Sequence, residues 1–155
     1  MLDKRKSLLG MGHPDTIKAA ANLASTYCSQ GRWSDAEKLE LEVLEKRKSL
    51  LGMGHPDTIK AAANLAVTYQ SQGRWGDAER LEVDVLEQRK SLLGMKHPDT
   101  IKAAVNLAST YYSQGRWSDA EKLQLEVLEQ RRSLLGTEHP GTIKAAVNLA
   151  KTYIS

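Results

Sequence analysis

The sequence predicts an all-α protein, a right-handed α-solenoid or superhelix built from antiparallel helix pairs. The first observation is a repeat: blocks of 42 residues recur almost unchanged over 11–52, 53–94 and 95–136. The second is that each block holds two long stretches whose apolar residues recur at three- and four-residue steps, which is typical of amphipathic helices. A helix pair of this size cannot bury its own apolar face, so neighbouring pairs must stack.

The predicted organisation is a single repeat array over residues 1–155. Residues 2–9 match the end of a block, so 1–10 are expected to form the end of a preceding second helix. Residues 137–155 match the beginning of a block and are expected to form the first helix of a fourth repeat. Both ends therefore cut through repeat units, as an excerpt of a longer array would.

The first helix of the first block is predicted over residues 14–30. Pro14 suits the first helical position, where its missing N–H costs nothing, and Asp15 favours the positive end of the helix. Gly31 suits the left-handed conformation that ends a helix. The apolar face of this helix is predicted to consist of Ile17, Ala20, Leu23, Ala24 and Tyr27.

The second helix is predicted to begin at a capping box, Ser34 to Glu37, and to end at Gly52. The third block repeats the box at 118–121, while Gly76 replaces the serine in the second. The apolar positions of the second helix in the first block are predicted to be Ala36, Leu39, Val43, Leu44, Leu50 and Leu51. Each unit is thus a pair of helices of about 17 residues, each roughly 25 Å long.

The segment from Asn22 to Ala36 carries a family resemblance. Leu23, Tyr27, Gly31 and Ala36 fall on signature positions of the tetratricopeptide repeat (TPR), a helix–turn–helix motif. The 42-residue period, the His-Pro-Asp opening and the Leu-Leu-Gly close resemble the long repeats of kinesin light chains and the repeat arms of fungal and bacterial NLR-like proteins. The sequence departs from the TPR signature where alanine replaces its tryptophan and glycine, and where Glu40, Glu82 or Gln124 replaces its late aromatic residue.

The first-helix positions that differ between copies share one face, because they are spaced by four and then three residues. They are Ala21, Ser25 and Cys28 in the first copy, Ala63, Val67 and Gln70 in the second, and Val105, Ser109 and Tyr112 in the third. In the arrays that this chain resembles, that face lines a concave groove. Two interpretations stay open: free variation at exposed positions, or a groove tuned for a ligand.

The same groove is expected to carry one lysine and one asparagine from each copy. A row of lysines at a repeat spacing of about 10 Å would attract an acidic ligand, and asparagine amides can pair with an extended peptide backbone. The alternative is that these lysines only keep the surface soluble. The candidate peptide-binding residues are Lys18, Asn22, Ser25, Ser29, Lys60, Asn64, Val67, Gln70, Lys102, Asn106, Ser109, Tyr112, Lys144 and Asn148.

Composition argues against several other classes of protein. The net charge of +3, with 26% charged residues, is not the strongly basic balance of a nucleic-acid-binding domain. No apolar run approaches the roughly 20 residues of a membrane span, so no membrane partner is expected. Cys28 is the single cysteine, which forbids an internal disulfide and fits a reducing, cytoplasmic location.

No catalytic, metal or cofactor site is predicted. There is one histidine per unit, at His13, His55, His97 and His139, and each directly precedes a proline at a helix start. Histidines about 10 Å apart cannot share a metal ion, since two ligands of one ion lie within roughly 4 Å of each other. The basic clusters at 46–48 and 131–132 are interpreted as solvated last turns of helices, where cations offset the helix dipole.

The predicted function is a non-enzymatic protein–protein interaction scaffold that binds an extended, acidic peptide in the groove lined by the first helices. Binding of chaperone tails is not expected, because Ala21 and Ser25 occupy the positions of the lysine and asparagine that clamp them in such repeats. The alternative is a structural spacer or self-associating rod without a groove ligand, either a natural excerpt or a consensus-like design. Such a rod would associate head to tail through its ends, residues 2–9 and 141–154.

Overall fold

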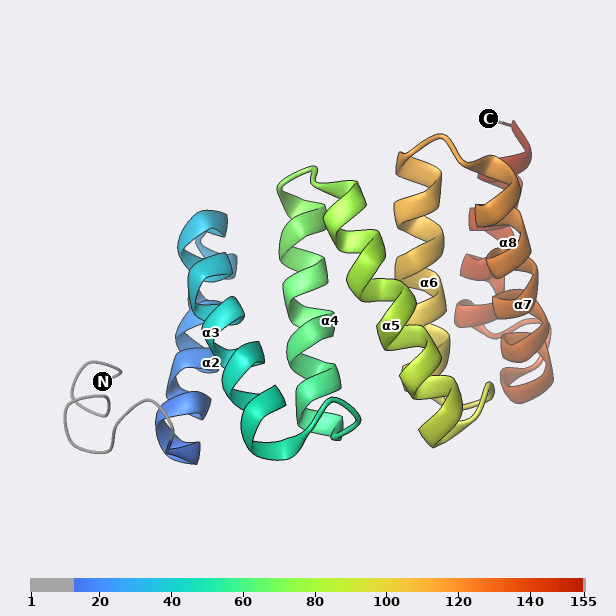
Figure 1. Ribbon diagram of the computed structural model, residues 1–155. Helices are drawn as coiled ribbons and strands as arrows, with labels where there is room; N and C mark the ends of the chain where they lie inside the picture. The colour runs from blue at the N-terminus through green and yellow to red at the C-terminus, as the bar shows by residue number, and fades with distance from the viewer. Residues whose placement is uncertain (1–12, 155) are drawn as a thin grey trace. The chain divides into compact units, whose positions relative to one another are not determined.

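The computed structural model describes residues 13–154, and this part of the chain is helical, with no strand (Figure 1). The all-α fold class is thereby confirmed. The predicted end of a preceding helix, residues 1–10, lies outside the described residues. The helices are α2 (Pro14–Ser29), α3 (Trp33–Leu51), α4 (Pro56–Ser71), α5 (Trp75–Leu93), α6 (Pro98–Ser113), α7 (Trp117–Leu135) and α8 (Pro140–Ile154).

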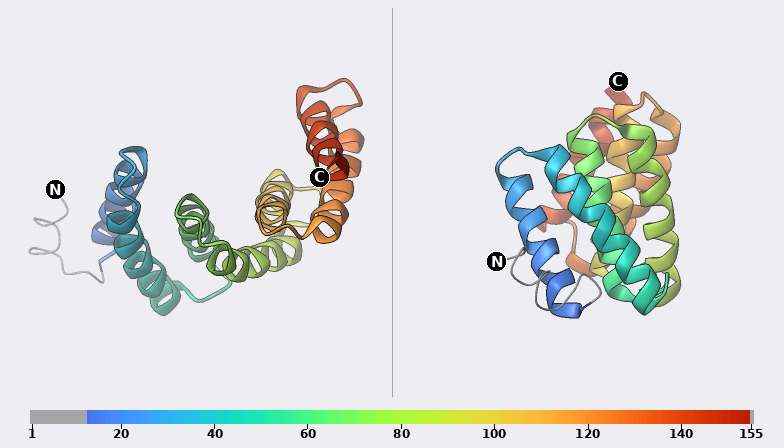
Figure 2. Two further views of the ribbon diagram at one scale, coloured as in Figure 1. Left: turned by 90° about the horizontal axis from the view of Figure 1, so that it is seen from above. Right: turned by 60° about the vertical axis from the view of Figure 1, so that its left-hand side comes forward.

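The chain divides into two compact units, one ending at Leu81 and the other beginning at Glu82, inside α5. In the first unit, α3 packs against both α2 and α4. In the second unit, α7 packs in the same way against both α6 and α8, which can be followed in the two views of Figure 2. Within each unit, the second helix, α3 or α7, therefore contacts the first helix of its own repeat and that of the next.

Each first helix begins at a histidine cap. The ring nitrogen Nδ1 of His13 accepts a hydrogen bond from the backbone N–H of Asp15 at 3.1 Å, and proline follows the histidine as the first helical residue. The same bond measures 3.0 Å at His55, His97 and His139. The interpretation of the histidines as helix-start residues is confirmed.

The turn between α2 and α3 corrects one prediction. Gly31 has φ +74° and the N–H of Arg32 reaches the carbonyl of Tyr27 at 2.8 Å, so the predicted left-handed end is confirmed. The capping box at Ser34, however, is wrong. The helix already begins at Trp33, and no side chain caps it.

The early start of α3 is explained by an arginine, Arg32, that contacts both the end of α2 and the beginning of α3. The Arg32 guanidinium lies over the Tyr27 ring at 4.3 Å and donates from Nε to Asp35 at 2.9 Å. This joins the last turn of one helix to the first turn of the next. Residues 74 and 116 repeat the arrangement, with Tyr69 and Asp77 and with Tyr111 and Asp119. The box at 118–121 is also wrong, since α7 begins at residue 117 without a side-chain cap.

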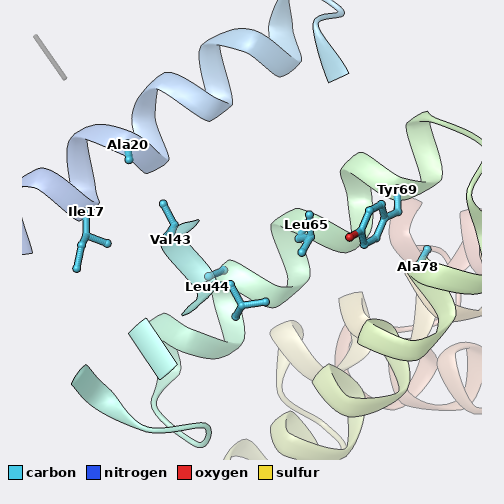
Figure 3. Close-up of a cluster of buried hydrophobic side chains, with 8 residues drawn as sticks. Ile17, Ala20, Val43, Leu44, Leu65, Tyr69 and Ala78 are labelled. Atoms are coloured by element: carbon cyan, nitrogen blue, oxygen red, sulfur yellow. The ribbon is translucent and has the colours of Figure 1, made fainter. Parts of the chain in front are cut away.

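The core of the first unit lies where α3 meets α2 and α4. Figure 3 shows Ile17 and Ala20 of α2 facing Val43 and Leu44 of α3, with residues of α4 on the other side. The prediction that Leu50 and Leu51 belong to the apolar face is wrong, since they are 54% and 44% exposed. The buried cluster consists of Ile17, Ala20, Val43, Leu44, Ala61, Leu65, Tyr69 and Ala78.

Candidate functional site

A cleft of about 270 Å³ opens on the second unit, with walls from two first helices and a base from the second helix between them. Figure 1 shows these elements as α6, α7 and α8. The lining residues are Val105, Ala108, Ser109 and Tyr112 of α6, Gln124, Val127 and Arg131 of α7, and Ala145, Asn148 and Lys151 of α8. The cleft therefore lies on the first-helix face that the sequence predicts to be variable.

The cleft combines an apolar base with a basic and polar rim. Ala108, Val127 and Ala145 are buried, with less than a twentieth of each exposed. Lys151 is exposed and Arg131 is half-buried, and both line the opening. No acidic side chain is among the lining residues. Such a surface suits a ligand with an apolar body and a negatively charged group.

Contacts within the unit hold the cleft-lining polar side chains in place. Arg131 donates from Nη1 to the carbonyl of Gly141 at 3.1 Å, across to the first turn of α8. Gln124 accepts a hydrogen bond from the Thr152 hydroxyl at 2.6 Å. On α6, the Tyr112 ring meets Trp117 edge to face, with centroids 4.8 Å apart and planes at 71°. The two hydrogen bonds arise from the stacking of repeats, the ring contact forms within one repeat, and together they orient the site before any ligand arrives.

The first unit has a repeat-equivalent pocket of only about 20 Å³. Every residue that lines it lies two repeat periods before a residue of the larger cleft. The two sites differ in charge, because Glu40 replaces Gln124 and Val67 stands at the position of Lys151. The small pocket is lined by Ala21, Glu40, Val43, Arg47, Ala61 and Asn64.

Glu40 is an acidic side chain buried between α3 and α4, only 8% exposed. It accepts a hydrogen bond from the Thr68 hydroxyl at 2.5 Å, and Thr68 also lies 3.5 Å from the Cys28 sulfur. The pKa of the Glu40 carboxyl is raised to about 7, mainly by burial; the Thr68 hydrogen bond opposes this shift and the neighbouring charge of Glu37 adds to it. At this position the TPR signature has an aromatic residue, whereas here Glu40 makes a polar contact between repeats.

The structure brings only some of the predicted groove residues to these two sites. Asn64 lines the small pocket, and Ser109, Tyr112 and Asn148 line the cleft. Gln70 and Asn106 are half-buried on α4 and α6 and line neither site. The other predicted residues are exposed on the first helices beside the two sites, namely Lys18, Asn22, Ser25, Ser29, Lys60, Val67, Lys102 and Lys144.

Sequence reasoning missed the two cations of the cleft. Arg131 belongs to a cluster predicted to lie on a solvated last turn, but it is half-buried and reaches the next helix. Arg47 and Arg89 make the same bond, to the carbonyls of Asp57 and Asp99. Lys151 stands in the variable column that holds Ser25, Val67 and Ser109, so comparing the fourth copy with the others would have found it.

Other classes of site can be checked over residues 13–154. Within that range no three His, Cys, Asp or Glu side chains gather where they could hold a metal ion. None of the helices described has the length and apolar character needed to cross a membrane. Cys28 is half-buried and has no disulfide partner.

A sequence profile described as tetratricopeptide repeat matches residues 15–91, 57–133 and 99–155. The chain belongs to the tetratricopeptide repeat family. No curated protein matches this TPR chain. TPR arrays mediate protein–protein interactions, and their fold is typically a non-enzymatic scaffold.

Solved structures share the TPR fold along nearly the whole chain. Two are of nearly identical TPR-like repeats from a kinesin light chain-like protein of Podosopora anserina, one of them a point variant. The variant has a TM-score of 0.90 at 24% identity, and the other has 0.89 at 25%; each alignment covers 99% of this chain and 72% of the other. BtubC (BKLC) from P. vanneervenii matches with a TM-score of 0.85 at 22% identity, over 97% of this chain and 61% of that one.

Proposed function

We propose that this TPR array is a cytoplasmic protein-interaction scaffold that binds an extended, acidic peptide along its first helices. The observation that carries the proposal is the cleft of the second unit, where Arg131 and Lys151 border an apolar base without an acidic neighbour in the lining. A cleft of this kind favours a ligand of negative charge, and the reducing conditions inferred from the lone cysteine suit a cytoplasmic protein.

The lysines on the first helices support an acidic ligand in both units. Lys18 and Lys60 are exposed in the first unit, and Lys102 and Lys144 in the second. Each stands one helical turn before an asparagine, whose amide can both donate to and accept from a peptide backbone. Charge would guide the peptide to the surface, while the cleft and its asparagine would hold it in register.

A random-peptide display selection on the full chain tests this proposal. Acidic peptides are expected to be enriched, and their affinity is expected to fall about tenfold or more when Lys18, Lys60, Lys102 and Lys144 are all changed to alanine. The loss should shrink at high salt because exposed charges are screened.

A matched variant controls for net charge in this experiment. Lys38, Lys46, Lys96 and Lys122 are also exposed, and they lie outside the first helices. Changing all four to alanine removes the same charge and should leave peptide affinity nearly unchanged. If both variants lose affinity equally, binding depends on net charge and not on the first helices. Failure to enrich any peptide on the parent would reject the proposal.

A second candidate is head-to-tail association between copies, favoured by an exposed apolar face on α8. Ile143 is 51% exposed, whereas the repeat-equivalent Ile17, Ile59 and Ile101 are 4%, 5% and 7% exposed. Val147 and Tyr153 are exposed on the same helix. An apolar face that other copies bury against a second helix is suited to packing against another copy of the chain.

Sedimentation velocity over a range of concentrations tests this association. The parent is expected to sediment faster as its concentration rises, and the Ile143→Lys variant is expected to remain a monomer, because a charge on that face cannot be buried without a partner. Lys144→Ala changes the neighbouring residue without altering the apolar face and serves as the control. A parent that stays monomeric at the highest concentration would exclude the association.

A further inference from the structure

The two repeat-equivalent sites of the chain differ in the charge that they present. In the first unit, the basic Arg47 faces a site that also contains the carboxyl of Glu40. In the second unit, Arg131 occupies the same position, Gln124 supplies a neutral amide, and Lys151 adds a second cation. These substitutions are the difference in charge between the two sites, which also differ in side-chain size where Val105 and Tyr112 line the second cleft in place of Ala21 and Cys28.

The site of the second unit can hold a carboxylate. The Arg131 guanidinium has five N–H donors, one of which is used on Gly141, and its fork matches the two oxygens of a carboxylate. Asn148 adds an amide donor from α8, and Lys151 lies one helical turn further along the same helix. Val127 and Ala145 are buried at the base, where the methylene groups of an acidic side chain can pack.

The site of the first unit lacks these properties. Its volume is about 20 Å³, against about 270 Å³ in the second unit, which is too small for an inserted side chain. A carboxylate placed beside Glu40 would meet a like charge as soon as Glu40 ionises, and repulsion between close like charges is unfavourable. Val67, at the position of Lys151, offers no compensating cation.

We infer that the cleft of the second unit is a carboxylate-specific subsite of the peptide-binding surface, which takes a glutamate or aspartate side chain between Arg131 and Lys151. The first-unit pocket does not share this preference. Nearly identical repeats therefore differ in what they recognise in the bound peptide: the acidic residue that binding requires contacts the second unit and not the first. This inference rests on the proposed function, because it assigns one residue of the peptide proposed above.

The experiment uses peptides selected by display on the full chain. For the best acidic peptide, each glutamate or aspartate is replaced in turn by glutamine or asparagine, and affinities are measured by fluorescence anisotropy. One such replacement is expected to weaken binding about ten- to a hundredfold, the range for a hydrogen bond to a charged group. The Lys151→Val, Gln124→Glu double variant, which places the first unit's residues at these two positions, should bind both forms of the peptide equally.

Several controls separate the possible results. Lys122 is exposed on α7 outside the cleft, so Lys122→Ala should keep the preference for the acidic form. Circular dichroism is expected to show that the double variant folds, because both of its residues occur at equivalent positions of the chain. A peptide with phosphoserine at the required position should bind no more tightly than the glutamate form, and tighter binding would overturn the assignment to a carboxylate.

The outcomes also distinguish this inference from the proposed function. If peptides bind but no single acidic residue is required, or if the double variant keeps the full preference, the inference is wrong and the scaffold function stands. If no peptide is selected on the parent, the proposed function fails and the inference fails with it.

Discussion

Replacing Leu65 by alanine is expected to lower the free energy of unfolding by about 3 kcal/mol, within the range measured for leucine-to-alanine changes in well-packed cores. Leu65 is 1% exposed and belongs to the cluster in which α3 joins α2 to α4. Truncation removes apolar contact with the second helix and leaves a cavity that fixed neighbouring helices can fill only in part. Urea unfolding followed by far-UV circular dichroism measures the loss.

The repeat supplies an internal control for this prediction. Leu23 is the equivalent residue on α2, is only half-buried, and packs at the edge of the same cluster. Leu23→Ala removes the same atoms and is expected to cost about 1 kcal/mol, because less apolar surface leaves water on folding there. Equal losses for the two variants would mean that the contact between α3 and α4 contributes no more than the edge of the core.

The helices could be predicted from the sequence because their determinants are local. Pro14, at the first helical position, and Gly31, with its positive φ, act through their own backbone, and the apolar period reports which face is buried. Copies of the same pattern then imply stacking. Element type and order therefore follow from residues a few positions apart, and the observed helices agree with them.

The capping box shows where local reasoning is insufficient. Ser34 and Glu37 have the right types and spacing, but Arg32 is held by Tyr27 and Asp35, and the helix begins before the serine. The Ser34-to-Glu37 spacing that defines a capping box gives no indication that an arginine stacks on a tyrosine of the preceding helix. Competition between two plausible local structures was decided by a contact across the turn.

The cleft shows the same difficulty for function. The sequence does not distinguish a basic residue in a last helical turn that points to solvent from one that bonds to the next helix, as Arg131 does. Lys151 contributes to the cleft because α8 lies beside α7, which depends on how repeats stack. Sequence comparison of the copies pointed to the first-helix face on which the cleft lies, while the side chains contributed by the second helix required the structure.

The stability of the chain is expected to fall as the pH rises through the range in which Glu40 ionises. Burial raises the pKa of this carboxyl to about 7 from an ordinary 4.5. Between these two values the folded chain holds a proton that the unfolded chain releases, so the free energy of unfolding decreases with increasing pH. Below about pH 4.5 both states are protonated and the contribution is fully present; above about pH 7 it is lost, and the shift corresponds to about 3 kcal/mol.

Glu40→Gln should remove the part of this dependence that Glu40 contributes, because the amide keeps an oxygen for the Thr68 hydroxyl and carries no charge to bury. Glu82, the equivalent residue of the next repeat, stays buried against Thr110 in parent and variant alike. The chain already contains that arrangement, since Gln124 accepts from Thr152 in the second unit. The variant is expected to match the parent near pH 4.5 and to exceed its stability by about 3 kcal/mol above pH 8, as measured by urea unfolding at each pH.

Nearby charges do not alter the sign of this prediction. Glu37 and Arg47 lie on the same helix as Glu40, and Tyr69 faces it from α4, and all three remain in the variant. Glu126→Gln alters an exposed carboxyl on α7 and should produce no such pH-dependent difference. Conversely, Gln124→Glu should add a further loss of stability at high pH. A difference between parent and Glu40→Gln that is the same at every pH would show that the buried carboxyl does not change its protonation on folding.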